Sequence, residues 1–444
     1  MESRLEKFAK TMGQVVPDAI TASVMLMVLL AGVALALGDS VRATMDAYYR
    51  GLWMLLPFTM QMTLIIVLSS VLGSTPQFRK SVIALSKLPK TSNQVMLLGI
   101  LVTSAAAYLY WGLGIAMSPI IAVYFAREAE RKGLKVDFLY FLAVIWAANS
   151  VWQFGLSASA PLLVATPGHF LEKEIGILPL KTTIWAPAAL VHEVVFLIAV
   201  MVAGCLLMPK HCRPVSEFPG TGALLEEPTP DKPGPHSWSE RVERSGFWAM
   251  VLCAMLCGWL YFHFMEKGMS LDINSLNTTL LLACLFFHGS VFAFARSVQK
   301  AVVSGWAVIV LYHLYAGVAG LVQFTITGPK LAGLIATVST PLTFPVLTAA
   351  VSTVFAMFIP SSGGQWAVQG FVTAKAAQSV GVTVQRGILA LSVGDQMGNL
   401  ASPFWYVVVA GITHVDFRGF FGYGLIFALI WFVIGSLAFT FLPC

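Results

Sequence analysis

Asp395 is the residue whose type and position most directly suggest chemistry. It is the only acidic or basic residue in four long apolar segments, each interrupted by glycine, proline or small polar residues. A carboxylate inside a bilayer is costly and typically marks an ion or proton pathway. Three roles are open: binding Na⁺, carrying a coupling proton, or ordering its own broken helix through Gln396 and Asn399. A structural acid bonded to freed backbone amides is the alternative.

Oxygen-bearing side chains in two of these segments could complete a site for a coupling cation. The predicted set is Asn149, Ser150, Asp395, Gln396 and Asn399. Carbonyl groups released where helices unwind would assist them. An Asn in an apolar helix can equally serve only to hold two helices together. No metal other than Na⁺ and no cofactor is predicted.

The four interruptions could also bind an anion, although they contain no Lys or Arg. A carboxylate there would depend on hydroxyl groups, exposed amides and the positive ends of half-helices. The predicted substrate-binding residues are Trp111, Gly112, Gly114, Ser157, Ser159, Thr166, Ser361, Ser362, Gly363, Gly364, Trp366 and Trp405. The tryptophans would suit a short apolar tail, or they could be packing residues. Close helix packing on small residues is the alternative for the rest.

Enzyme chemistry has little support in the sequence. His192-Glu193 begins like a zinc-protease HExxH motif, but the second histidine position is Phe196. A phosphate-binding GxxxxGK[ST] loop is also missing. We therefore predict a protein that is not an enzyme.

The positions of the interruptions predict which helices hold these residues. Segments 94–126 and 344–374 are too long for one membrane span and too short for two, which predicts re-entrant helical hairpins with tips at Trp111–Gly114 and Pro360–Gly364. Segments 138–170 and 387–413 each contain a glycine and small polar residues before a proline, which predicts helices that break and restart.

Composition places the whole chain in a membrane. Of the 444 residues, 57% are hydrophobic and 11% are charged, with a mean hydropathy of +0.80. A soluble domain carries about 25% charged residues. The net charge of +6 comes from cations in short loops, which favours a topological explanation over nucleic-acid binding. We expect an all-α polytopic membrane protein.

The same order of segments occurs twice, on either side of a Pro- and Gly-rich polar linker. The predicted regions are 1–17, an N-terminal amphipathic segment; 18–208, the first half; 209–245, the cytoplasmic linker; and 246–444, the second half. Each half contains a span, an amphipathic connector (76–90 or 328–341), a hairpin, a broken helix and a final span, about eleven transmembrane helical units in all. Matched interruptions of this kind are typical of transporters with inverted repeats.

The distribution of cations predicts orientation. With the N-terminus in the cytoplasm and hairpins returning to their side of entry, 19 of the 27 Lys and Arg residues fall in cytoplasmic segments. This satisfies the positive-inside rule. The hairpins then open from opposite sides, and the C-terminus is expected outside, in the periplasm of a bacterial inner membrane protein.

Taken together, these stretches resemble the short-chain fatty acid transporter family over some 390 residues. The motifs are Pro17-Asp18, the run 58–67, Trp111–Gly114, Phe125–Glu128, Pro161–Gly168, Asn274–Asn277 with His288, the run 360–370, and Gly394–Gln396 continuing through Asn399 to Trp405. The sequence departs from the family pattern at Ser362, Gln365 and Asp395, where the pattern has glycine, histidine and glutamate. These changes bear on the substrate and the coupling ion more than on the fold.

This resemblance implies a secondary carrier of small monocarboxylates such as butyrate or acetoacetate, coupled to Na⁺ or H⁺ and working by alternating access. It also implies a fold similar to the wider group of sodium-coupled carboxylate carriers, with a moving transport domain, a scaffold domain and often a homodimer. A carrier of other carboxylates and a Na⁺/H⁺ exchanger are the alternatives. Expected partners are the carboxylate and membrane lipid, without nucleic acid.

Overall fold

The computed structural model describes residues 19–225, 237–266, 268 and 271–444. Every regular element within these ranges is helical. The all-α prediction is thus confirmed. The predicted amphipathic segment 1–17 and the centre of the predicted linker, 226–236, lie outside the described residues.

Seven helical stretches in the described part of the chain are long and apolar enough to cross a membrane, or eight if one bent pair counts as a span. They are Val41–Gly73, Ser92–Leu109, Phe138–Ala165, Pro187–Leu206, Trp238–Glu266, Trp306–Phe324 and Arg418–Phe441. The predicted eleven units also included shorter apolar helices such as α18 (Phe344–Ala356) and α21 (Pro403–Thr413), which are too short to cross alone.

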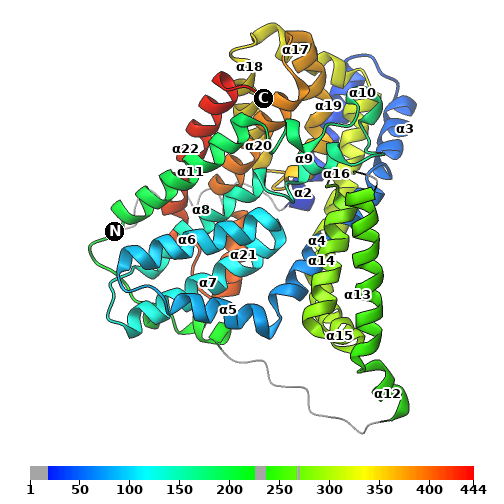
Figure 1. The fold of residues 1–444 in the computed structure, drawn as a ribbon. Coiled ribbons are helices and arrows are strands. Elements are labelled where there is room, and N and C mark those ends of the chain that lie inside the picture. The colour runs from blue at the N-terminus through cyan, green and yellow to red at the C-terminus, as the bar shows by residue number, and fades with distance from the viewer. Residues whose placement is uncertain (1–18, 226–236, 267, 269–270) are drawn as a thin grey trace.

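The two halves contain matching elements in the same order (Figure 1). In the first half these are α2 (Ala19–Ala36), α3 (Val41–Leu52), α4 (Leu56–Gly73), α5 (Pro76–Ser86), α6 (Ser92–Leu109), α7 (Trp111–Arg131), α8 (Phe138–Ala148), the 3-10 segment η1 (Asn149–Phe154), α9 (Ser159–Ala165) and α11 (Pro187–Leu206). In the second half they are α14 (Ile273–His288), α15 (Val291–Ala301), α16 (Trp306–Phe324), α17 (Thr327–Val338), α18, α19 (Ser362–Val380), α20 (Val384–Ala401), α21 and α22 (Arg418–Phe441). Helix α13 (Gly246–Tyr261) joins them.

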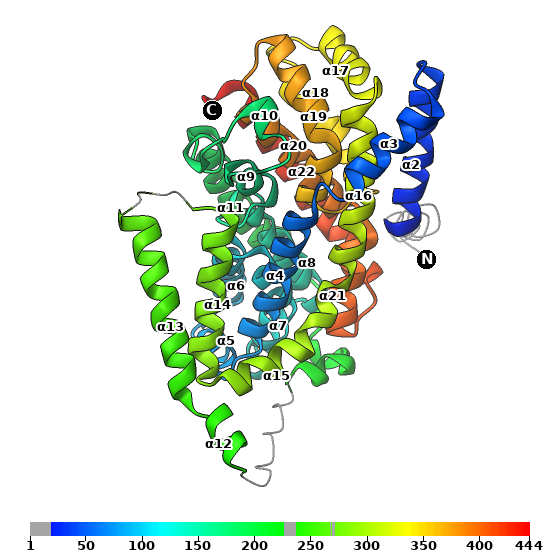
Figure 2. The same ribbon diagram turned by 90° about the vertical axis from the view of Figure 1, so that its right-hand side faces the viewer.

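The first two described helices of each half pack against a helix of the other half. Helices α2 and α3 contact α16, whereas α14 and α15 contact α4; Figure 2 shows α3 and α15 near opposite ends of the molecule. Likewise α9 contacts α19, and α7 contacts α21. These reciprocal contacts are what two structural repeats related by a pseudo-two-fold axis would make.

Both predicted hairpins are present as antiparallel helix pairs. In the first, Lys132 after α7 donates hydrogen bonds from Nζ to the carbonyl oxygens of Lys87, at 2.5 Å, and Pro89, just before α6. In the second, Gln365 Nε2 of α19 donates to the carbonyl of Ser352 in α18 at 2.9 Å. The pairs lie toward opposite ends of the molecule (Figure 1). That each hairpin enters and leaves a bilayer on one side stays a prediction.

The two predicted broken helices are also present. After η1 the chain is non-helical through Ala158, and Gly155 sits so close to Tyr108 that an added Cβ would lie 2.8 Å from its Cα. In the second half the break is a single extended residue, Ser402, followed by Pro403 at the start of α21. Proline has no N–H to continue a helix but fits the first helical turn, which explains the restart.

The positions of two breaks differ from the sequence prediction. Trp111–Gly114 forms the first turn of α7, and the interruption is Tyr110 alone, in an extended conformation. Gly398 and Asn399 are still helical in α20. Glycine lowers helix propensity without ending a helix when neighbouring packing supports it.

Two further segments differ from expectation. The apolar stretch 276–294 is not one straight helix, because α14 ends at His288 and α15 leaves at a 118° bend. Gly289 at the bend has a φ of +69°, which glycine adopts without steric cost. Residues 38–51, where the sequence indicated no helix, contain most of α3, an amphipathic helix with one face packed on α16.

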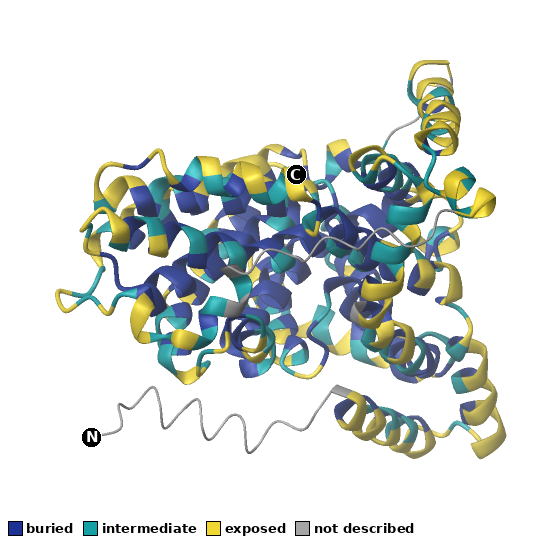
Figure 3. Cartoon of the chain, turned by 90° about the horizontal axis from the view of Figure 1, so that it is seen from below, coloured by how far each residue is buried: buried dark blue, intermediate teal, exposed yellow. Residues whose placement is uncertain are grey.

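Figure 3 shows buried residues filling the main body, with exposed residues concentrated on its periphery. Helix α13 is largely outside this core, because only 11% of the most apolar window in Trp238–Glu266 is buried. Its exposed Met250, Met255 and Trp248 are apolar, as expected of a helix that faces lipid.

Gly51→Val is expected to destabilise the packing of α3 on α16. A Cβ at Gly51 would lie 2.5 Å from Cα of Gly320, with the Gly320 amide nitrogen at 2.7 Å, and backbone atoms cannot give way as flexible side chains do. Overpacking costs about 1–3 kcal/mol, so we expect a lower unfolding temperature in detergent. Gly32→Val, at a helical glycine with no atom within 4 Å of its added Cβ, is the control. Equal unfolding temperatures for the two variants would contradict the prediction.

Candidate functional site

Four helices that begin in the interior contribute residues from their first turns to one cavity. The cavity has a volume of about 90 Å³, enough for several water molecules or one small solute. Its wall includes Trp111 of α7, Ser159 of α9, Ser362 of α19 and Trp405 of α21. Because each of the four helices starts at or within a few residues of a predicted interruption, the chain brings its four breaks together at one place. A helix start exposes amide groups and positive potential.

The starts of α9 and α19 lie directly against each other. A Cβ added to Gly363 would be 3.3 Å from Cβ of Ser159. The hydroxyl of Ser362 is buried and has no hydrogen-bond partner among the described residues. Two helix N-termini beside an unpartnered hydroxyl are well suited to accept the oxygens of an anion.

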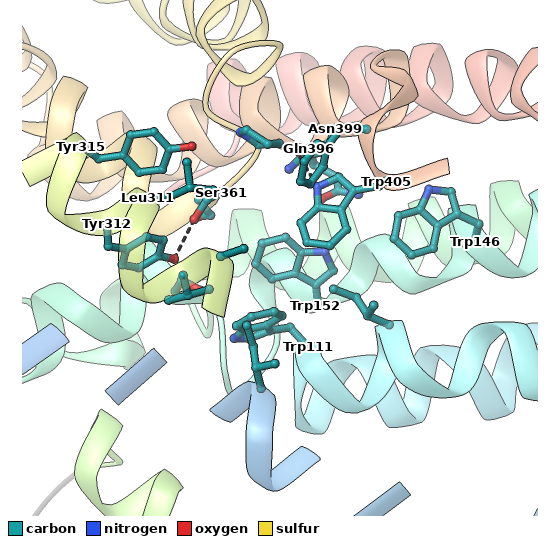
Figure 4. Close-up of a pocket in the computed structure, with 18 residues that line it drawn as sticks. Trp111, Trp146, Trp152, Leu311, Tyr312, Tyr315, Ser361, Gln396, Asn399 and Trp405 are labelled. Carbon is teal, nitrogen blue, oxygen red and sulfur yellow. Dashed lines mark hydrogen bonds between the residues drawn. The ribbon is translucent and has the colours of Figure 1, made fainter. Parts of the chain in front are cut away.

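Ser361 fixes the tip of the second hairpin. Its hydroxyl accepts from the amide of Gly364 at 3.3 Å, capping α19. It also shares a hydrogen bond of 2.7 Å with the hydroxyl of Tyr312 from α16. Tyr312 and Ser361 thus place hydroxyl groups at one side of the cavity (Figure 4). Ser362, the next residue, also lines the cavity.

The other side of the cavity is aromatic. Trp111, Trp146, Trp152 and Trp405 gather opposite Tyr312 (Figure 4). Ring centroids of Trp111 and Trp152 are 6.2 Å apart, and those of Trp146 and Trp405 are 6.3 Å apart. A cavity with hydroxyls at one side and indole rings at the other matches a small solute with a polar head and an apolar tail.

The tip of the first hairpin is held by the first broken helix. Ser157 accepts from the amide of Trp111 at 2.7 Å, and the amide of Leu156 donates to the carbonyl of Tyr108 at 2.7 Å. Ser157 therefore caps α7 in this structure. Its predicted contribution to substrate binding would be indirect, through the position of Trp111.

Asp395 lies next to the cavity in a polar cluster built from η1 and α20. It is fully buried. Its Oδ2 accepts from Gln153 Nε2 at 2.5 Å and from Asn399 Nδ2 at 3.0 Å. Gln396 Nε2 donates to the hydroxyl of Ser150 at 2.7 Å. These contacts bring together four of the five predicted cation-site residues.

Several oxygen atoms of this cluster have no hydrogen-bond donor among the described residues. They are Gln153 Oε1, Asp395 Oδ1, Gln396 Oε1 and the Ser392 hydroxyl oxygen. Buried polar atoms are nearly always paired in folded proteins. A group of unpaired acceptors beside one carboxylate has the chemistry that a cation requires.

The remaining predicted residues lie outside the cavity wall. Gly112 packs on Ser69, Gly114 on Ala107 and the Asn149 side chain, and Gly364 on the ring of Tyr315. Thr166 accepts from the amide of Ile273 at 3.2 Å, at the start of α14. Trp366 is buried against Gly370. Asn149 precedes Ser150 of the Asp395 cluster in sequence, and its Oδ1 is likewise unpartnered in the described structure.

Sequence reasoning missed other residues of the site: Gln153, Ser392, Trp146, Trp152, Tyr312 and Tyr315. For two of these residues, the spacing from predicted site residues could have indicated a place in the site. Ser392 lies three residues before Asp395, on the helix face that also carries Gln396 and Asn399. Gln153 follows Asn149 by one helical turn. Tyr312 and Tyr315 belong to an uninterrupted apolar helix, where nothing in the sequence marks them.

Neither the histidines nor the cysteines offer a rival metal centre. Within the described ranges no three His, Cys, Asp or Glu side chains are grouped closely enough to hold a metal ion. His192 is enclosed by aromatic rings, with Trp431 at 4.3 Å and Phe154 at 5.0 Å between centroids. This environment is that of a packed core residue.

Comparisons with known proteins identify the family of this chain. Two curated relatives match along almost their entire length, and both are named as candidate short-chain fatty acid transporters. One, from Haemophilus influenzae, is 30% identical over 98% of this chain and 99% of its own. The other, from Escherichia coli, is 29% identical over the same shares.

A solved structure shows the same fold. The crystal structure of the YdaH transporter of Alcanivorax borkumensis, described as having an unusual topology, aligns with a TM-score of 0.55 at 14% identity, covering 96% of this chain and 98% of that one. The family model described as "Short chain fatty acid transporter" matches residues 1–442. The chain belongs to the short chain fatty acid transporter family.

Proposed function

We propose that this protein is a secondary carrier that moves short-chain monocarboxylates such as butyrate across a bacterial inner membrane by alternating access, together with Na⁺. The supporting observation is the convergence of four helix starts on one small cavity beside the Asp395 cluster. Half-helix N-termini at a repeat interface are a recurring way for transporters to bind anionic groups.

In this proposal the carboxylate lies between α9 and α19, where Ser159 and Ser362 present hydroxyl groups at the helix starts. The tail lies against Trp111, Trp152 and Trp405. The cavity wall contains no Lys or Arg, so the anion is held by hydrogen bonds and helix dipoles. Such a site binds one small carboxylate without a permanent positive charge that would hinder its release.

The coupling ion in this proposal is Na⁺, held by Asp395 with amide and hydroxyl oxygens around it. A proton on Asp395 would supply one hydrogen-bond donor, whereas four acceptor atoms in the cluster lack one. An oxygen-binding cation uses several such atoms at once. One carboxylate also balances one positive charge, which favours a monovalent cation over a divalent one. The resulting neutral pair is easier to move through a low-dielectric region.

Ser362→Ala is the direct test of the substrate site. Removing a hydroxyl that bonds a charged group costs about 1.5–3 kcal/mol, so we expect KM for labelled butyrate to rise about 10- to 100-fold in proteoliposomes with an inward Na⁺ gradient. Because the Ser362 hydroxyl has no hydrogen-bond partner among the described residues and Ser361 provides the cap, folding should be unchanged.

Ser379→Ala is the matched control on the same helix. Its hydroxyl is exposed and bonds only the Lys375 carbonyl in the described structure, so uptake should equal that of the wild type. A Ser362→Ala protein with wild-type KM would remove this residue from the substrate site. Wild-type vesicles that accumulate no short-chain acid would refute the proposed function itself.

A further inference from the structure

Trp405 contacts both the proposed substrate cavity and the Asp395 cluster. Its ring lines the substrate cavity, and its indole Nε1–H donates to Asn399 Oδ1 at 3.3 Å. Asn399 in turn donates from Nδ2 to Asp395 Oδ2 at 3.0 Å. A continuous path of hydrogen bonds therefore runs from the cavity wall to the buried carboxylate.

The amide of Asn399 makes this path sensitive to a cation. Its nitrogen faces Asp395 and its oxygen faces Trp405. The group is planar, so it cannot turn its oxygen toward an ion beside Asp395 without giving up both hydrogen bonds. Conversely, a tail that packs on the ring of Trp405 fixes the indole N–H and with it the orientation of the Asn399 amide.

We propose that Trp405 is a positioning residue that links cation binding to substrate binding through Asn399. This inference rests on the proposed function. Because linkage is reciprocal, substrate must change the affinity for the cation by the same factor as the cation changes the affinity for substrate. The indole N–H carries this linkage, while the ring contributes contact area only.

Trp146 provides an internal comparison. It lines the same cavity, 6.3 Å from Trp405 between ring centroids. Its indole N–H has no hydrogen-bond partner in the part of the chain that the structure describes. The two tryptophans therefore differ in the feature that the proposal invokes.

The test compares Trp405→Phe with Trp146→Phe in the full-length protein, using labelled butyrate and Na⁺ as probes. For each protein, butyrate KM is measured over a range of Na⁺ concentrations. A coupling of the usual size changes affinity about 5- to 150-fold. We expect the Na⁺ dependence of KM to shrink at least fivefold in Trp405→Phe and to stay unchanged in Trp146→Phe. Trp405→His, whose ring can keep an N–H donor, should retain part of the dependence.

The outcomes separate this inference from the proposed function. If wild-type uptake depends on Na⁺ and Trp405→Phe keeps the wild-type dependence, the linkage through Trp405 is wrong while the carrier stands. If Trp405→Phe does not fold, Trp405→His decides: loss of the dependence in a folded protein with intact maximal uptake contradicts the role of the donor. Wild-type uptake without any Na⁺ dependence overturns the proposed coupling as well.

Discussion

Asp395→Asn is expected to abolish Na⁺-driven accumulation of butyrate while leaving the protein folded. The side chain keeps its size and its oxygen for Gln153 and Asn399, but it loses the only charge in the cluster. Removing one partner of a buried ionic interaction costs about 3–5 kcal/mol, which corresponds to a loss of Na⁺ affinity of about 100-fold or more. Concentrative uptake should fall to background at a Na⁺ concentration that saturates the wild type.

Asp46→Asn is the control for removal of an acidic residue. Asp46 is exposed on α3 and faces Arg42 at 4.0 Å, and a surface ion pair of this kind contributes little. Its uptake should match that of the wild type. If instead Asp395→Asn accumulated butyrate with the wild-type response to Na⁺, the carboxylate would be a structural acid, as the sequence alone also permits.

Gly363→Val is expected to eliminate substrate binding by separating the starts of α9 and α19. A Cβ at this position would lie 2.8 Å from an atom of the Phe58 ring and 3.3 Å from Cβ of Ser159. The branched side chain must then shift the start of α19, because Phe58 of α4 is itself buried and stacked on the ring of Tyr312, with 5.5 Å between centroids. We expect butyrate uptake to drop at least 100-fold, since a misplacement of about 1 Å can cost that much.

Binding measured directly, for example by calorimetry in detergent, would separate this effect from a fault in the transport cycle. Gly411→Ala is a suitable control, because it is a helical glycine of α21 with no atom within 4 Å of its added Cβ. It should bind and transport like the wild type. Wild-type binding by Gly363→Val would mean that the carboxylate does not lie between these two helices.

The parts of the site that could be predicted from the sequence are those set by neighbouring residues along the chain. Prolines and glycines in apolar segments mark interruptions whatever the tertiary structure, so the breaks before Ser159, Ser362 and Pro403 could be placed within a few residues. The spacing of Asp395, Gln396 and Asn399 likewise determined a shared helix face. These predictions depend on distances along one helix, and such distances are encoded directly in the chain.

The partners of these residues depend on packing between distant segments. Tyr312 reaches Ser361 from α16, and Gln153 reaches Asp395 from the other half of the molecule. No pattern in a single sequence brings such positions together. The same limit explains the missed α3: its Gly51 contacts Gly320, and only that partner makes an apolar face of a short helix stable.

The reciprocal packing of α2 and α3 on α16, and of α14 and α15 on α4, has a consequence for biosynthesis. As the chain leaves the ribosome, α2 and α3 are made long before α16, the helix that they contact. Their native contacts must form across the full span of the chain, which slows folding and leaves early helices without partners. We therefore expect that neither half folds alone, because each lacks the helices on which its first helices pack.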